Sequence, residues 1–169
     1  MIDNQHILES LSGKFSSEIL QQEVLYGILT VTVSPAVLHD TIQFLKETER
    51  LEFEFLTDLC GIHYPDQEDP FGVVYLMYNM RENTRVRIKT FLPKENPSIP
   101  TVTDLFSAAN WMERETYDFY GVNFMGHPNL IRILNVEYLD YFPLRKEYPL
   151  EDPTREDKDN RFFGREASV

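Results

Sequence analysis

The residues of this chain that could do chemistry are concentrated at 113–118, which read Glu-Arg-Glu-Thr-Tyr-Asp. Two carboxylates beside a tyrosine, followed by His127, are residue types that general acid–base catalysis uses. As a helix, the same stretch places Arg114 one turn before Asp118, which favours hydrogen-bonded ion pairs that fix the helix to the segment after it. No second catalytic signature accompanies the stretch. We therefore favour the structural interpretation and keep, as an alternative, a stand-alone acid–base enzyme that uses Glu113, Asp118 and His127.

The other reactive residues give weaker signals. Cys60 and His63 form a Cys-x-x-His pair, but we expect Cys60 to be a small buried thiol and His63, like His6 and His39, to be a surface or half-buried side chain. The four histidines lack metal-ligand spacing, and one cysteine cannot form an internal disulfide, a zinc knuckle or an iron–sulfur site. The sequence also has no glycine-rich nucleotide loop and no nucleophile elbow. We expect no catalytic, metal-binding or cofactor-binding residues in this chain.

The composition is that of a folded acidic domain. The 169 residues are 42% hydrophobic and 13% aromatic, which excludes a disordered polymer. They include 28 acidic and 16 basic residues, a formal net charge of -12, which excludes nucleic-acid binding driven by phosphate neutralisation. The start of the chain has neither the basic nor the apolar region of a signal peptide, and no apolar run approaches the ~20 residues of a membrane-spanning helix. We expect a soluble, reduced, intracellular protein.

Periodicity gives the elements that must position these residues. Apolar spacing predicts a helix over 4–15, and Ser34-Pro35 begins a second helix that runs to about 48. Alternation predicts strands, which we place at 23–33, 53–62, 71–80 and 85–91. In the last of these strands, Arg85, Arg87 and Lys89 alternate with other side chains, so that one face is basic and meets either solvent or a partner.

The final third of the chain changes in character. Three prolines between 93 and 100 predict an exposed connection without regular structure, and a helical stretch then runs over 101–120 and ends at Gly121. The segment after Gly121 is rich in proline and aromatic residues and keeps no period, and its rings gain stability only against their own domain or another chain. The predicted fold class is α+β, a two-layer domain with helices on a small mixed sheet at 1–121. A long extended C-terminal tail at 122–169 follows and packs either on this domain or on another chain.

The region from Trp111 to Leu150 closely resembles the respiratory complex I 30 kDa subunit family, which supplies the C subunit of proton-pumping NADH–quinone oxidoreductase. Three elements stand in the family's order and spacing: Glu-Arg-Glu-x-x-Asp, Gly-His-Pro and Pro-Leu-Arg-Lys. We assign the motif positions to fold and interface rather than to catalysis. They are Glu113, Arg114, Glu115, Asp118, His127, Arg132, Arg145 and Lys146.

The resemblance implies a specific place in a larger enzyme. Members of the family lie in the hydrophilic arm, peripheral to the inner membrane on its cytoplasmic side, and meet the membrane only through the complex. That complex passes electrons from NADH to quinone and couples this to proton translocation, with FMN, iron–sulfur clusters and quinone held by other subunits. The C-terminal segment of the family wraps against the neighbouring D subunit, which forms the quinone chamber with the B subunit.

The sequence departs from the family in two places. Ile131 stands where the family is usually basic, which leaves Arg132 as the cation there, and 139–142 replace the usual Trp-x-Gly-His, so that contacts of 131–142 are not transferred from the family. Two further alternatives stay open: the equivalent subunit of a membrane-bound hydrogenase or ferredoxin-fed complex, and a binding module unrelated to respiration. We expect Arg145→Ala to reduce assembly, on the premise that Arg145 belongs to a buried ion pair.

Overall fold

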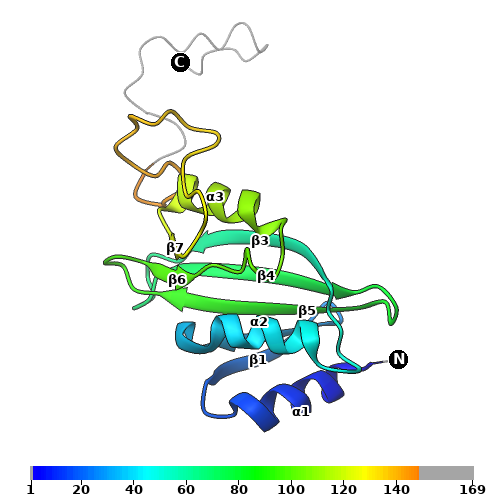
Figure 1. Cartoon of the computed structure of the whole chain (residues 1–169). Helices are drawn as coiled ribbons and strands as arrows, with labels where there is room; N and C mark the ends of the chain where they lie inside the picture. The colour runs from blue at the N-terminus through cyan, green and yellow to red at the C-terminus, as the bar shows by residue number, and fades with distance from the viewer. Residues whose placement is uncertain (1, 149–169) are drawn as a thin grey trace, which may run out of the picture.

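A computed structural model describes residues 2–148 of the chain. The helices are α1 (Asn4–Phe15), the short 3-10 helix η1 (Pro35–Val37), α2 (Leu38–Glu47) and α3 (Ala109–Tyr120). The strands are β1 (Ile19–Leu25), β2 (Ile28–Val33), β3 (Phe55–His63), β4 (Phe71–Asn79), β5 (Thr84–Leu92), β6 (Ser98–Pro100) and β7 (Asn123–Met125). Helices lie on a mixed sheet, which confirms the predicted α+β class (Figure 1).

The main sheet has the strand order β1-β2-β5-β4-β3. All neighbours are antiparallel except β2 and β5, which run parallel because the chain passes through α2, β3 and β4 between them. Residues in register across neighbouring strands point to the same side of the sheet. One such row, at the centre of the sheet, contains Leu59, Tyr75, Ile88 and Val31, all of them buried.

This buried side of the sheet forms the core with the helices. The α2 residues Leu38, Ile42 and Leu45 recur at helical spacing and are fully buried, and α1 contributes Ile7 and Leu11 in the same way. Asp3 caps α1, since its carboxylate accepts a hydrogen bond from the backbone N–H of His6 at 2.8 Å.

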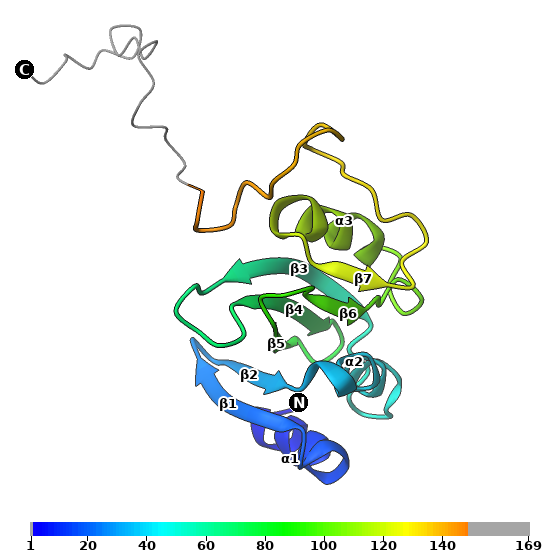
Figure 2. The ribbon, with the colours of Figure 1, turned by 90° about the vertical axis from the view of Figure 1, so that its left-hand side faces the viewer.

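The opposite side of the sheet has no described helix over it. Figure 2, which looks along the strands, shows α2 on one side of the sheet, α3 at the β3 edge and no helix on the other side. One row on this uncovered side joins Asp58, Leu76, Arg87, Thr30 and Glu23. The next row joins Cys60, Val74, Lys89, Thr32 and Gln21.

The prediction of one strand over 23–33 is wrong, because the chain turns back within it. β1 and β2 form an antiparallel hairpin whose turn is Tyr26-Gly27, with φ values of 52° and 80°. A positive φ at both central residues gives the turn that matches strand twist, and glycine adopts it without strain. The other three predicted strands are confirmed as β3, β4 and β5.

The predictions around the final helix need two corrections. The helix begins at Ala109 rather than near 101, and the proline-containing connection holds the short strand β6. β6 pairs in parallel with β7, a strand that the sequence did not indicate after Gly121. The predicted end of the helix is confirmed, since Gly121 has φ 75° and its N–H donates to the carbonyl of Tyr117. Of the predicted tail, 149–169 lie outside the described residues.

Candidate functional site

The carboxylate of Asp118 is the centre of the site. It is fully buried on α3, and its Oδ2 accepts backbone hydrogen bonds from Ile133, Leu134 and Asn135 at 2.8–3.1 Å. Its Oδ1 accepts from the Asn135 amide at 3.0 Å and from Arg132 at 2.8 Å. Burial by itself raises the pKa of Asp118, but these bonds outweigh burial and hold the pKa below its ordinary value. Asp118 is thus an anion at neutral pH, and residues 132–135 fold around it.

Arg132 connects Asp118 to residues 139–142 further along the chain. Its guanidinium is buried and donates to the carbonyl of Asp118 as well as to the carboxylate. The other guanidinium nitrogen donates to the carbonyls of Leu139 and Tyr141, and the group lies 5.0 Å from the centre of the Phe142 ring. A planar cation with several donors is suited to such a position, because one side chain can fix three stretches of backbone. The ion pair joins α3 to the segment after it, with Arg132 rather than Arg114 as the cation.

Arg145 attaches the end of the described chain to α3 and the sheet. Its Nε donates to the carbonyl of Tyr120 at 2.8 Å, and its guanidinium lies over the rings of Phe71 and Phe142 at 4.4 and 4.6 Å. Burial lowers the pKa of Arg145 from its ordinary value, and Glu147 opposes this. No carboxylate of the described residues lies within 4 Å of the guanidinium. Within residues 2–148, Arg145 is therefore held by a carbonyl and two aromatic rings and not by the ion pair that the sequence led us to expect.

His63 is a site residue that sequence reasoning missed. It is buried rather than on the surface, stacks on Phe71 at 4.5 Å, and its Nδ1 accepts the backbone N–H of Lys146 at 2.9 Å. Burial lowers the pKa of His63, although Glu147 opposes this. The Lys146 side chain is exposed, so the position acts through its backbone. Strand alternation could have predicted the burial of His63, because every second residue of a strand points to the same side of the sheet. His63 stands two residues after Gly61 and four after Leu59, and so shares their inward side.

Glu113 fixes the loop before α3. It is fully buried; Oε1 accepts the backbone N–H of Val102 at 2.8 Å and Oε2 accepts the hydroxyl of Thr101 at 2.5 Å. Burial raises the pKa of Glu113 to about 7, against the two hydrogen bonds, which lower it. Asp104 raises the pKa further, and His39 lowers it. The buried hydroxyl of Tyr75 has no hydrogen-bond partner among residues 2–148, and the charge of Glu113 adds to burial in raising the pKa of Tyr75.

Three motif residues remain. Arg114 stacks on Trp111 at 4.9 Å and donates to the carbonyl of Ile131 at 3.2 Å. His127 accepts the N–H of Asn129 at Nδ1, so its Nε2–H donates to the carbonyl of Asn110 at 3.1 Å. The remaining residue, Glu115, is exposed.

A cavity of about 270 Å³ lies where α3 crosses the edge of β3. Its lining includes Glu115, Asp58 and Cys60. The expectation that Cys60 is buried is wrong, because its side chain is exposed on the uncovered side of the sheet. Partial desolvation of the thiol raises the pKa of Cys60, and the charges of Asp58 and Glu115 raise it further, which disfavours the reactive thiolate.

The three residues proposed for the alternative acid–base enzyme face different segments of the chain and not one shared substrate position. Glu113 faces 101–102, Asp118 faces 132–135, and His127 faces Asn110 and Asn129. Each is occupied by internal hydrogen bonds, and an anion as strongly held as Asp118 is a poor proton acceptor at neutral pH. The arrangement is suited to fixing the shape of 122–148.

The segment so fixed directs apolar side chains outward. Leu134 and Tyr138 are 65% and 87% exposed. Ile131, Val136 and, on the adjoining face of α3, Trp111 are 44%, 48% and 63% exposed. We call these five residues the apolar loop surface. Several exposed apolar side chains close together in the sequence of an ordered segment are typical of a protein–protein contact.

Residues 2–148 contain neither a candidate metal site nor a candidate membrane-spanning helix. Among residues 2–148, no group of three or more His, Cys, Asp or Glu side chains could hold a metal ion. Within the same part of the chain, none of the helices has the length and apolar character needed to cross a membrane.

Comparison with known families gives one family over most of the chain. Residues 31–154 match the model of the respiratory-chain NADH dehydrogenase 30 kDa subunit. The C 2 subunit of the NADH-quinone oxidoreductase of Rhizobium meliloti is 42% identical over 144 residues, 85% of this chain and 78% of that protein. The C subunit of the NADH-quinone oxidoreductase of Geobacter sulfurreducens is 40% identical over 157 residues, 92% of this chain and 96% of that protein.

Solved structures share the fold. A trypsin-resistant fragment of Nqo5 superimposes with a TM-score of 0.64 at 31% identity, over 75% of this chain and 98% of the fragment. A chain of the membrane-bound sulfane sulfur reductase, an archaeal respiratory membrane complex, gives a TM-score of 0.72 over 92% of this chain and 96% of that chain. Its identity of 24% makes this second likeness one of fold.

Proposed function

This chain belongs to the family of the respiratory-chain NADH dehydrogenase 30 kDa subunit, and on that premise we propose that it is a peripheral-arm subunit of an NADH-quinone oxidoreductase with no catalytic residues of its own. The enzyme as a whole transfers electrons from NADH to quinone and couples this to proton translocation. The part of this chain is to support assembly and the subunits that form the quinone site.

One observation carries the non-catalytic role: Asp118, Arg132 and Arg145 are occupied in holding 122–148 in shape. Asp118 and Arg132 bond to each other and to the backbone of the segment, and Arg145 bonds to the end of α3. What this order presents to the outside is the apolar loop surface. A structure in which the charges are internal and the apolar groups external is suited to docking.

We assign the apolar loop surface to the neighbouring D subunit, with the B subunit close by. In this proposal the chain binds no FMN, iron–sulfur cluster or quinone, which belong to other subunits. It lies peripheral to the inner membrane on the cytoplasmic side and meets the membrane through the complex alone. The exposed Leu134 and Tyr138 are the residues that we expect to be buried by the D subunit.

The test is purification of the complex through a tag on this chain from detergent extracts. We expect the other hydrophilic-arm subunits, including those that oxidise NADH, in equal stoichiometry. A chain that elutes alone under mild conditions contradicts the proposal. A complex that contains hydrogenase or ferredoxin-oxidising subunits instead of NADH-oxidising ones favours the alternative assembly.

A matched pair of double variants tests the docking surface. Leu134→Ser with Tyr138→Ser removes two exposed apolar groups from the apolar loop surface and should strongly reduce recovery of partners. Leu20→Ser with Tyr26→Ser removes groups of the same type, 64% and 100% exposed on the β1 hairpin, and should leave recovery unchanged. Equal loss or equal retention in both variants contradicts the assignment.

A further inference from the structure

The uncovered side of the five-stranded sheet is a second surface that the motif residues do not explain. We call it the open face and define it by Arg85, Arg87 and Lys89 of β5 with Val74, Leu76 and Tyr78 of β4. It lies opposite the side that α2 covers, as the view along the strands shows (Figure 2). The apolar loop surface belongs to 131–138 and α3, so that the two surfaces are made by different elements.

The residue types of the open face differ from those of a simply solvated sheet. Antiparallel sheets that meet water on one side usually alternate apolar inward with polar outward. Here the outward residues of β4, which lies between β5 and β3, are Val74, Leu76 and Tyr78, each partly exposed. Apolar side chains gathered on an exposed sheet surface indicate that another molecule covers them.

The neighbouring strand β5 places positive charge along one side of this apolar centre, and β3 places Asp58 on the other side. Arg87 donates to the hydroxyl of Thr30 at 3.3 Å, and no carboxylate of the described residues lies within 4 Å of its guanidinium. Lys89 has a contact with Glu23 at 3.5 Å, and Arg85 stacks on the Tyr78 ring at 4.6 Å. These three cations lie along β5 in a chain with a net charge of -12, and the same face carries two acidic residues, Asp58 of β3 and Glu23 of β1.

We infer that the open face is a second docking surface and that it receives a protein surface on which carboxylates stand among apolar side chains. The inference rests on the proposed function, since it places the partner in the same complex. Apolar burial supplies the attraction, and the carboxylates meet Arg87 and Lys89, which fixes orientation and excludes other partners.

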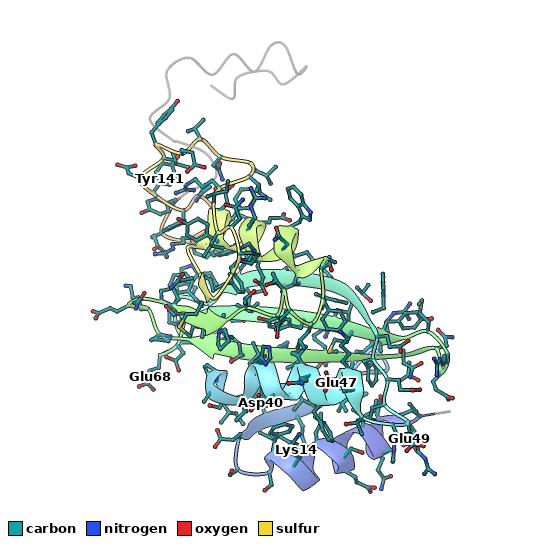
Figure 3. All side chains as sticks on the ribbon, in the orientation of Figure 1. Lys14, Asp40, Glu47, Glu49, Glu68 and Tyr141 are labelled. Carbon is teal, nitrogen blue, oxygen red and sulfur yellow. The ribbon has the colours of Figure 1, made fainter. Side chains whose placement is uncertain are left out.

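Other occupants fit less well. A nucleic acid or an anionic membrane is a polyanion, which a chain of net charge -12 repels at long range. A second copy would have to present acidic groups, and Asp40, Glu47 and Glu49 extend from the helix side (Figure 3). Such a contact joins two different faces, so repeated copies build a ring or an open chain rather than a symmetric pair.

The experiment uses the purified complex and the isolated full chain. Carbodiimide joins an amine to a carboxylate in direct contact, so we expect Lys89 in the complex to be cross-linked to a carboxylate of another subunit, identified by peptide mass. Cys60 lies in the same row as Val74 and Lys89 and reports coverage of the face. We expect its alkylation in the complex to be about tenfold slower or more than in the isolated chain, as for a contact that excludes water.

Two controls make the result specific. A cysteine introduced by Ser17→Cys, at an exposed turn between α1 and β1, should be alkylated at the same rate in both samples. Arg87→Glu should reduce the amount of this chain retained after a salt wash by about tenfold, because it sets a carboxylate against carboxylates. Arg50→Glu makes the same charge change at an exposed position outside the sheet and should have no effect.

The outcomes separate this inference from the proposed function. A chain that purifies without partners contradicts the proposed function itself. A chain that purifies with its partners, but whose Cys60 reacts at the isolated rate and whose Lys89 is cross-linked only to Glu23, overturns the inference and leaves the proposed function intact. Flotation of the isolated chain with anionic phospholipid vesicles, abolished by Arg87→Glu, overturns it in favour of a membrane.

Discussion

Asp118 and Glu113 are two buried carboxyl groups on one helix with opposite protonation behaviour. Asp118 accepts five hydrogen bonds, three of them from consecutive backbone N–H groups, and its pKa lies below its ordinary value. Glu113 accepts two hydrogen bonds and its pKa is raised to about 7. The number of donors that surround each group accounts for the difference, because burial disfavours the charge in both.

Asp118→Asn should destabilise the chain by about 3–5 kcal/mol, because it leaves the buried guanidinium of Arg132 without its anion. The free energy of unfolding in urea measures this. Asp140→Asn, at an exposed residue, should change that free energy by less than about 0.5 kcal/mol. Since the folded pKa of Asp118 is depressed, its contribution is complete above the ordinary value of 3.8 and is lost as the pH falls below it. Equal stabilities of the two variants at pH 7 would contradict the role given to Asp118.

Glu113 should make stability fall as the pH rises. Its folded pKa of about 7 exceeds the ordinary value of 4.5, so the folded state retains a proton that the unfolded state has lost. The stabilisation is complete below pH 4.5 and is lost as the pH rises through 7, by up to about 3 kcal/mol. Glu113→Gln should flatten the profile over this range, whereas Glu115→Gln, exposed on the same helix, should follow the unmodified chain. Parallel profiles for all three proteins would refute the explanation.

At the residue level, the sequence indicates which positions matter but not what they bind. The pairing of Asp118 with a cation is foreseeable from the charge pattern, yet Arg132 and the N–H groups of 133–135 belong to a loop without periodicity, whose path no local rule predicts. His63 is similar: strand parity places it inward, but its partner, the backbone of Lys146, lies 83 positions away in the sequence.

At the level of elements, periodicity predicts the amphipathic helices and the long strands, and it fails for short ones. β6 and β7 have three residues each, too few to show alternation, and they exist because they pair with each other. The β1–β2 hairpin was missed because its turn contains Tyr26 in place of the asparagine or aspartate that usually marks such a turn. Hydrophobic periodicity does not identify the buried face of α3, because the buried residues of this helix include Glu113, Arg114 and Asp118.

The end of α3 gives a prediction at this level. Gly121→Ala should destabilise the chain by about 1–3 kcal/mol, because residue 121 has φ 75° and a Cβ there would stand 2.5 Å from the Phe142 ring and 2.6 Å from Arg145. Gly13→Ala lies inside α1 with no atom within 4 Å of the added carbon and should stabilise by about 0.5–1 kcal/mol. Thermal unfolding of the two variants measures this, and a shift of the same sign in both would refute it.

For the whole molecule, the contacts that attach 142–148 to the sheet and to α3 are those that we expect assembly to depend on most. Arg145 makes that link through a carbonyl and two rings, so charge alone does not replace it. Arg145→Ala should lower the amount of this chain recovered in the intact complex. Arg145→Lys should not restore it, because an ammonium group has neither the Nε–H nor the planar face. Recovery measured in the same detergent purification tests both, and full rescue by lysine would show that charge is the property required.

The three backbone N–H groups that converge on Asp118 also bear on how fast and how tightly this chain meets its neighbour. A segment without regular structure normally loses its conformational freedom at the moment of association, which weakens binding. Here the loop of 132–135 is already ordered around an anion inside its own chain, so that loss has occurred during folding. The exposed Leu134 is thus held in a preorganised geometry, and this chain loses less conformational freedom on association than an unordered segment would.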